Sequence, residues 1–139
     1  MLVSVMEYVQ MKLKNIEKMS KLGFTAGNFD LLHPGYIYTF EEAKKHCDKF
    51  IVFLQRDPSV HRKSKYKPII PLYERYKTLM SIKYIDEVYI YQTEKDLLNL
   101  INFLRFILIG APRNAGLFIF IFPCFFLDHH LIIIITDLI

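Results

Sequence analysis

Short apolar runs alternate with amphipathic stretches along most of this chain, and that alternation limits its possible folds more than any other feature. Four runs have the length and apolar content of buried strands. Between them, apolar residues recur every three or four positions, as they do on one face of a helix. This alternation predicts an α/β fold, a parallel sheet with helices on both faces. The predicted strands are 23–27, 50–54, 88–91 and 106–110, and the predicted helices are 36–47, 71–80 and 93–101.

The two ends of the chain depart from this alternation. Residues 1–22 place apolar side chains at helical spacing among lysines, which predicts an amphipathic extension ahead of a domain spanning 23–139. From about residue 111 the chain becomes strongly apolar, above all in LFIFIFPCFFL (117–127) and LIIII (131–135). Each run is too short to span a bilayer. Three accounts of this divergent tail stay open: a buried edge of the sheet, a hydrophobic anchor or oligomer surface, and a reading-frame or assembly error.

Length, charge and cysteine content narrow the class of protein. A chain of 139 residues is the size of one domain, and 18 Lys and Arg against 14 Asp and Glu leave a net charge of +4. That surplus suits an anionic ligand but is small for a nucleic-acid-binding protein, so no nucleic-acid partner is expected. Cys47 and Cys124 have no partners at metal-ligand spacing and are interpreted as buried apolar residues. Without a secretory signal at its start, the chain is expected to be cytoplasmic, with no membrane partner.

The most informative segment joins the first predicted strand to the next helix. It reads TAGNFDLLHPGY, from Thr25 to Tyr36. Backbone N–H groups and the positive end of the helix dipole attract an anion at such a junction. Gly27 lets the backbone approach a ligand, and Gly35 lets the helix begin tightly against it. The segment therefore predicts a phosphate-binding turn, with His33 and Tyr36 on one face of the helix end.

The residues of this turn resemble the motifs of a known family. The segments GNFD (27–30) and HPG (33–35) resemble the G-x-F-D and H-x-G-H motifs of the cytidylyltransferases, such as the glycerol-3-phosphate and choline-phosphate enzymes. The resemblance implies a Rossmann-like fold of the HUP type. In that family both histidines contact the triphosphate, so the resemblance assigns a catalytic role to His33, while Tyr36 replaces the second histidine. It implies nucleotide binding by Thr25, Ala26, Gly27, Asn28, Phe29, Gly35 and Tyr36.

The replacement at Tyr36 has a chemical consequence. A tyrosine hydroxyl donates a hydrogen bond to a phosphate oxygen, but it supplies neither the positive charge nor the proton-transfer range of imidazole. Loss of one positioned donor costs on the order of a hundredfold in rate. The sequence therefore leaves the rate, and even the activity, open.

The resemblance continues after the second predicted strand. Asp57 closes that strand, and Lys65 and Lys67 lie in a long loop, residues 56–71, where the family places lysines over the phosphates. Arg75 follows at the start of a helix, where an arginine of the family helps to hold the substrate phosphate. The resemblance thus implies that Asp57, Lys65 and Arg75 bind substrate and that Lys67 is catalytic.

The resemblance covers roughly residues 23–110 and weakens beyond them. Its last clear motif is KYIDEV (83–88), which resembles the family's R-Y-V-D-E-V segment. The family's base-contacting G-[DE]-D-[WY] segment is replaced here by GAPRN (110–114). Of the closing motif that binds the triphosphate, only Thr136 stands in a matching place, after four isoleucines.

Simpler interpretations compete for several of these residues. An aspartate in a turn commonly caps a helix, and we prefer that structural role for Asp30. Lys65 and Lys67 are equally explained as part of a solvated basic loop. An arginine on a helix surface, as expected for Arg75, is usually half of a weak ion pair. The histidine pair at 129–130 fits a turn better than a metal site, so no protein-bound metal is assigned.

Together these features predict a nucleotidyltransferase that moves a nucleoside monophosphate, in the first interpretation CMP from CTP, onto a small phosphorylated alcohol such as glycerol 3-phosphate, releasing pyrophosphate. Mg²⁺ is the expected companion, because it neutralises the triphosphate and the departing pyrophosphate. Two alternatives stay open: an adenylyltransferase of the same superfamily that uses ATP, and a non-catalytic nucleotide-binding or degenerate relative. Because many members of the resembled family are dimers, a homodimer is also an option.

Overall fold

The computed structural model describes residues 21–109 and 132–136, and its side chains are described for residues 21–103. Strands and helices alternate through this part of the chain, as the sequence predicts. The elements in chain order are β1 (Lys21–Gly27), α2 (Pro34–Lys45), β2 (Lys49–Gln55), the 3₁₀ turn η1 (Pro58–Val60), α3 (Leu72–Met80), β3 (Glu87–Tyr91), α4 (Glu94–Ile109) and β4 (Ile132–Thr136). Residues 1–20 of the predicted N-terminal extension lie outside the described residues, and its last two residues belong to β1.

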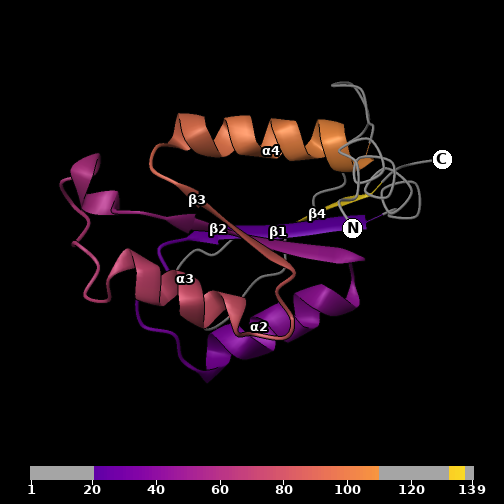
Figure 1. Cartoon of the computed structure of the whole chain (residues 1–139), viewed down its shortest axis with the longest axis horizontal. Helices are drawn as coiled ribbons and strands as arrows, with labels where there is room; N and C mark the ends of the chain where they lie inside the picture. The colour runs from indigo at the N-terminus through magenta and orange to yellow at the C-terminus, as the bar shows by residue number, and fades with distance from the viewer. Residues whose placement is uncertain (1–20, 110–131, 137–139) are drawn as a thin grey trace, which may run out of the picture.

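Three parallel strands form most of the sheet, whose order is β3-β2-β1-β4. β1 pairs with β2 from Leu22 opposite Lys49 to Gly27 opposite Leu54, and β2 pairs in parallel with β3. Figure 1 shows α2 and α3 on one face of the sheet and α4 on the other. The predicted parallel sheet with helices on both faces is therefore confirmed for these three strands.

The predicted strand at residues 106–110 is wrong, because α4 continues through residue 109. At its start, the backbone N of Thr93 donates to Asp96 Oδ2 at 2.8 Å, and the N of Asp96 donates to Thr93 Oγ1 at 3.1 Å. This reciprocal pair is a capping box, which confirms Thr93 as the predicted N-cap. No glycine or proline lies between Thr93 and Gly110. A short apolar run that follows such a start continues the helix as readily as it forms a strand.

The fourth strand comes from the apolar tail. β4 pairs antiparallel with β1, from Lys21 opposite Thr136 to Thr25 opposite Ile132. This part of the tail therefore lies in the sheet, as one of the three accounts of it expected, but its direction differs from the predicted all-parallel arrangement. Within residues 21–109, no helix has the length and apolar content needed to cross a membrane.

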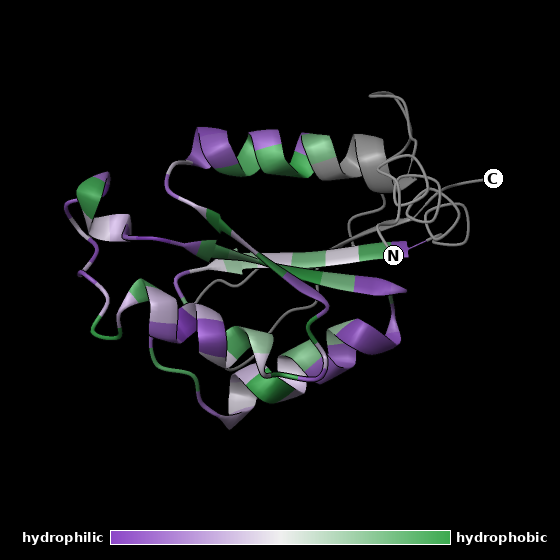
Figure 2. Cartoon of the chain, viewed as in Figure 1, coloured by the Kyte–Doolittle hydropathy of each residue, from purple (hydrophilic) through white to green (hydrophobic). Residues whose placement is uncertain are grey.

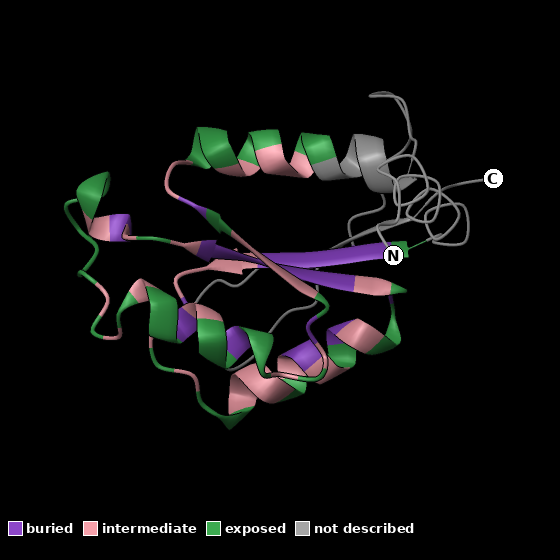
Figure 3. Cartoon of the chain, viewed as in Figure 1, coloured by how far each residue is buried: buried purple, intermediate pink, exposed green. Residues whose placement is uncertain are grey.

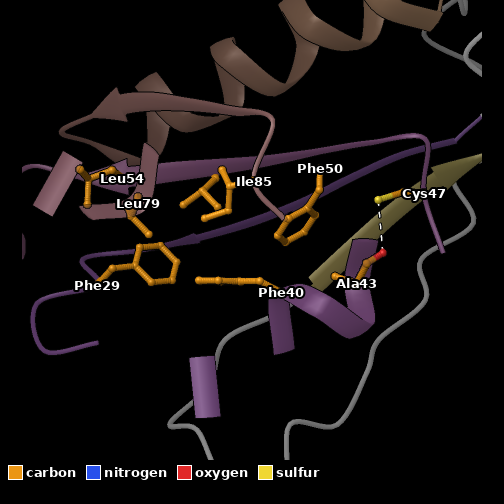
Figure 4. Close-up of a cluster of buried hydrophobic side chains, with 9 residues drawn as sticks. Phe29, Phe40, Ala43, Cys47, Phe50, Leu54, Leu79 and Ile85 are labelled. Atoms are coloured by element: carbon orange, nitrogen blue, oxygen red, sulfur yellow. Dashed lines mark hydrogen bonds between the residues drawn. The ribbon is translucent and has the colours of Figure 1, made fainter. Parts of the chain in front are cut away.

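The core consists of apolar side chains packed on both faces of the sheet. β2 is buried continuously over residues 50–54 because helices cover both of its faces. On the α2 and α3 face, Phe50 and Leu54 pack with residues of those helices, as Figure 4 shows. On the α4 face, Ile51 and Phe53 pack with residues of β1, β3 and α4. Figures 2 and 3 show that β1 and β2 are mostly hydrophobic and buried, whereas the outward faces of the helices are largely hydrophilic and exposed.

Cys47 lies in this core, as the sequence predicts. Its side chain is 8% exposed, and its thiol donates to the carbonyl oxygen of Ala43 at 3.3 Å (Figure 4). Burial raises the pKa of the thiol to about 11. The thiol is therefore uncharged at neutral pH and packs as a small apolar group. Cys124 lies outside the described residues.

Candidate functional site

A cavity of about 520 Å³ lies at the carboxyl ends of β1, β2 and β3. Its walls come from those strand ends, from the loop that follows β2 and from the first turn of α4. Ligands of open α/β sheets bind at the carboxyl ends of the strands. Five predicted site residues line this cavity, namely Ala26, Gly27, Asn28, Tyr36 and Lys65. Their contacts with a ligand stay predictions.

His33 stands at the start of α2 and is its N-cap. Its backbone is extended, and its Nδ1 accepts a hydrogen bond from the backbone N of Gly35 at 3.1 Å. An accepting Nδ1 carries no proton, so in the neutral ring the proton lies on Nε2, which is then a hydrogen-bond donor. A Cβ atom at Gly35 would lie 2.7 Å from Cε1 of His33. Glycine at this position therefore allows the imidazole to fold back over the helix end.

Tyr36 connects His33 to the cavity. The two rings lie 4.8 Å apart between centroids, so the predicted pairing on one face of the helix end is confirmed. Tyr36 lines the large cavity, whereas His33 lines a smaller, mostly apolar cavity of about 410 Å³ between α2 and α3. Tyr36 also packs edge-on against Phe29, with 5.7 Å between ring centroids. The residue that replaces the family's second histidine is thus the one at the cavity wall.

Phe29 and Asp30 shape the turn between β1 and α2 from beneath. Phe29 has a positive φ of 45°, in the left-handed region that non-glycine residues rarely adopt. Its side chain is 1% exposed and belongs to the core, so burial of the ring holds the backbone in this conformation. The predicted nucleotide contact of Phe29 can therefore involve its backbone but not its buried ring.

Asp30 has a structural role, as the sequence analysis preferred, but it does not cap α2, so that part of the prediction is wrong. Its two carboxylate oxygens instead accept hydrogen bonds from the backbone N of Ile69 and of Ile70, each at 2.8 Å. The helix needs no cap from Asp30 because His33 occupies that position. Asp30 therefore ties the turn after β1 to the loop that precedes α3, a link across 40 residues of sequence.

Arg75 is buried, which contradicts the simpler interpretation of it as a helix-surface residue in an ion pair. Its side chain is 3% exposed, and its guanidinium donates hydrogen bonds of 2.7 to 2.9 Å to four backbone carbonyl oxygens. The acceptors belong to Asn28, Gln55, Arg56 and Ile70. Burial lowers the pKa of Arg75, and the charges of Asp30 and Asp57 oppose that shift. Four of the five N–H groups of the guanidinium are thus committed to the protein, which favours a structural role over the predicted contact with a substrate phosphate.

Asp57 shapes the beginning of the loop after β2. Its Oδ1 accepts hydrogen bonds from the Ser59 hydroxyl at 2.6 Å and from the Ser59 backbone N at 2.9 Å, which caps η1. The hydrogen bond from the Ser59 hydroxyl is the largest cause of a lowered pKa of Asp57. The hydrogen bond from the Ser59 backbone N and the charges of Lys67 and Arg75 lower the pKa further. The carbonyl oxygen of Asp57 also accepts from Gln92 Nε2 at 2.9 Å. Substrate binding by Asp57 and catalysis by Lys67 stay predictions, since neither residue lines the cavity.

The cavity also contains residues that the sequence analysis missed. Gln55 and Tyr91 are the last residues of β2 and β3, and Glu94 begins α4. An ion pair between Arg62 and Glu94 connects the loop to α4 at the edge of the cavity. The ends of neighbouring parallel strands meet at one edge of a sheet, so the predicted strand ends were the available signal for Gln55 and Tyr91. The Arg62 pairing had no such signal.

Four predicted nucleotide-binding residues do not line the cavity, namely Thr25, Phe29, Gly35 and Thr136. Thr136 pairs with Lys21 at the amino end of β1, whereas the cavity lies at the Gly27 end, about 20 Å along the strand. The predicted contact of Thr136 with the triphosphate is therefore not supported, because β4 runs antiparallel and its carboxyl end points away from the site. Thr25 is 2% exposed, between its neighbouring strands, and does not line the cavity.

Comparison with known proteins connects this site to a family. A model of the cytidylyltransferase-like family matches residues 24–112. The chain is similar to the bifunctional protein HldE of Hyphomonas neptunium, with 42% identity over 78 residues, which are 55% of this chain and 16% of that protein. It is also similar to the FAD synthase of Thermococcus kodakarensis, with 37% identity over 75 residues, which are 53% of this chain and 50% of that protein. The chain thus spans half or less of the length of these relatives.

A solved structure is also similar to this chain. The crystal structure of the lipopolysaccharide core biosynthesis protein from Thermoplasma volcanium matches with a TM-score of 0.51 and 26% sequence identity. The match covers 60% of this chain and 67% of that one. The family match contains every residue that lines the cavity and most of the described chain. This chain therefore belongs to the cytidylyltransferase-like family.

Proposed function

We propose that this chain is a nucleotidyltransferase that transfers AMP from ATP onto a phosphorylated small molecule. The observation that carries the proposal is the cavity at the ends of β1 to β3, bordered by the start of α2 and by a basic loop. The positive end of the α2 dipole and the side chain of Lys65, which lines the cavity, attract a triphosphate. Members of the cytidylyltransferase-like family provide the reaction class.

The relatives favour AMP transfer over the CMP transfer that the sequence first suggested. FAD consists of flavin mononucleotide joined to AMP, so a relative named FAD synthase forms an adenylylated product. The base-contacting motif of the cytidylyltransferases, which would support CTP, is replaced in residues 110–114. Those residues lie outside the described part of the chain, so the choice between ATP and CTP rests on the relatives.

In the proposed reaction, a phosphate oxygen of the acceptor attacks the α-phosphorus of ATP. The bond between that phosphorus and the oxygen bridging to the β-phosphate breaks, and its electrons leave with pyrophosphate. We assign to His33 Nε2–H and to the Tyr36 hydroxyl hydrogen bonds to triphosphate oxygens, because Tyr36 lines the cavity and the tilted His33 ring lies 4.8 Å from it between centroids. Lys65 and Lys67 would stabilise the charge on the departing pyrophosphate. None of these groups needs to form a covalent intermediate.

Mg²⁺ is proposed to enter as part of the substrate, bound to the triphosphate. Among the side chains described for residues 21–103, no three His, Cys, Asp or Glu groups gather closely enough to hold a metal ion. Mg²⁺ bound with nucleotides usually takes substrate phosphates and water as most of its ligands. It would supply charge neutralisation at the triphosphate when bound.

The test is pyrophosphate release by the full chain with Mg²⁺, comparing ATP with CTP across glycerol 3-phosphate, choline phosphate, a hexose 1-phosphate and flavin mononucleotide. The sharpest variant is His33→Asn, because asparagine is a strong N-cap and keeps a bond to the N of Gly35 while losing the reach of Nε2. We expect ATP-dependent release that falls by about a hundredfold or more in this variant. Release that depends on CTP would overturn the nucleotide assignment.

A non-catalytic nucleotide-binding relative is the second candidate, and the observation that favours it is Tyr36 at the cavity wall. Its signature would be ATP binding by calorimetry without pyrophosphate release from any pair of substrates. Tyr36→His separates the two candidates. Pyrophosphate release that appears or rises in this variant indicates a site that lacks only the second imidazole. If the variant binds ATP but releases no pyrophosphate, the result supports a non-catalytic binding protein.

A further inference from the structure

The loop between η1 and α3 carries most of the basic residues near the cavity. Residues 61–67 are all exposed and form no helix or strand. Figure 3 shows this part of the loop in green, beyond the end of β2. Within it, Lys65 lines the cavity and Arg62 pairs with Glu94. Little apolar packing is available to an exposed loop, so its position depends on polar contacts at its two ends.

The far end of the loop is held by two side chains from different elements. Both oxygens of Asp30 accept from the loop backbone at Ile69 and Ile70, and Arg75 Nε donates to the carbonyl oxygen of Ile70 at 2.9 Å. Both polar groups of the Ile70 main chain are therefore bonded, one to a carboxylate and one to a guanidinium. Hydrogen bonds to charged groups contribute more than neutral ones.

Arg75 also reaches the walls of the cavity. Its Nη1 donates to the carbonyl oxygens of Asn28 at 2.7 Å and Gln55 at 2.9 Å, and Nη2 donates to Arg56 at 2.7 Å. Asn28 and Gln55 both line the cavity. One buried guanidinium therefore joins the turn after β1, the end of β2 and the far end of the loop.

We propose that Asp30 and Arg75 are paired positioning residues that fix the far end of the loop against the turn after β1, so that Lys65 faces an anion in the cavity. Asp30 acts from the turn, and Arg75 acts from the first part of α3. Neither residue contacts the ligand. The part of the proposal that concerns a nucleotide rests on the proposed function, whereas the fixation of the loop does not.

Limited trypsin digestion of the full chain tests the fixation directly. Trypsin cleaves after exposed lysine and arginine but not before proline, so the loop offers sites after Arg62, Lys63 and Lys65, and the Lys67–Pro68 bond resists. Asp30→Asn removes the negative charge and leaves one accepting oxygen for two N–H groups, without changing any trypsin site. Arg75→Lys keeps the charge, but its single nitrogen cannot span four carbonyls. We expect each variant to speed cleavage in the loop by about tenfold, as the loss of one to two charged hydrogen bonds predicts.

Matched controls separate fixation from general damage. Glu74→Gln neutralises an exposed carboxylate next to Arg75, and Lys77→Met removes an exposed cation from the same helix. In both controls, trypsin should cleave the loop at the wild-type rate. Thermal unfolding of every variant shows whether faster cleavage is confined to the loop, and if Arg75→Lys fails to fold, Asp30→Asn alone still tests the proposal.

A double-mutant cycle with Mg-ATP affinity as the second readout completes the test. If Asp30 and Arg75 act through the same loop end, each single variant weakens binding by about tenfold and the double variant by little more, rather than by the product. Additive effects, or loop cleavage unchanged in both single variants, would overturn the proposal. A wild-type chain that binds no nucleotide contradicts the proposed function alone, because the cleavage pattern still reports on the pair.

Discussion

Gly23 and Gly35 meet the same steric limit in two different regions of the molecule. A Cβ atom at Gly23 would lie 2.7 Å from Sγ of Cys47, and one at Gly35 would lie 2.7 Å from Cε1 of His33. Cys47 is buried between α2 and the sheet, whereas His33 is exposed at the start of α2. The same distance therefore constrains core packing in one region and the position of a candidate site residue in the other.

The difference teaches how each region keeps its shape. The core is held by many apolar contacts that cannot move independently, so a misfit there costs free energy of unfolding. The start of α2 is held differently, because the exposed His33 ring accepts one directed hydrogen bond from Gly35 N, so a misfit there displaces a side chain at little cost in stability. Substitutions should thus separate stability from activity according to region.

The largest effect is expected for Phe50→Ala, which opens a cavity in the core beside Gly23. Phe50 is 0% exposed, and truncating such a side chain lowers the free energy of unfolding by about 3–5 kcal/mol. Urea denaturation measures the loss. Phe103→Ala is the control, because that ring is 58% exposed and should cost less than about 1 kcal/mol. Equal losses in the two variants would contradict the assignment of the core.

Gly23→Ala should lower stability by about 1–3 kcal/mol through overpacking against Cys47. The neighbouring sulfur cannot move away, because the thiol donates a hydrogen bond to the carbonyl oxygen of Ala43 and is surrounded by core side chains. Urea denaturation again provides the measurement. Adding Cys47→Ala to this variant removes the clashing atom and should restore part of the loss. If the double variant is no more stable than the sum of the singles predicts, the clash is not the cause.

Raising the pH should destabilise the core region through Cys47. The pKa of the thiol rises from 9.0 to about 11 on folding, so its contribution is fully present below pH 9.0 and is lost as the pH rises toward 11. Between pH 8 and pH 10 this group should lower the free energy of unfolding by about 1 kcal/mol. The Cys47→Ala variant has no thiol, so its free energy of unfolding should fall less over this pH range. Identical pH profiles for the two proteins would argue against a buried, neutral thiol.

Gly35→Ala should have the smallest effect on stability, within about 1 kcal/mol. The added methyl group displaces the exposed His33 ring, while alanine is the better helix former in α2. Loss of the His33 position should nevertheless lower pyrophosphate release by about tenfold or more. The NMR signals of the His33 ring report the displacement independently of activity. A variant destabilised as much as Gly23→Ala would remove the contrast between the two regions.

Several parts of the fold and site were predictable from local pattern. The parallel strands followed from apolar runs, and the start of α4 followed from Thr93 with Asp96 three residues later. The strand predicted at 106–110 failed because a short apolar run looks alike in a strand and in the last turn of a helix. Asp30 was assigned to a nearby cap because the sequence could not show that Ile69 and Ile70 are its partners.

The sequence by itself determined the order of elements from β1 to the start of α4, the turn from Gly27 to Tyr36 and the family to which the chain belongs, because these depend on neighbouring residues. Tertiary structure alone decided that Arg75 is buried among carbonyl groups and that Thr136 lies at the far end of β1 from the cavity. It also joined Arg62 to Glu94. The physical reason is that hydrogen bonds and ion pairs depend on distances of about 3 Å between residues that are far apart in the chain.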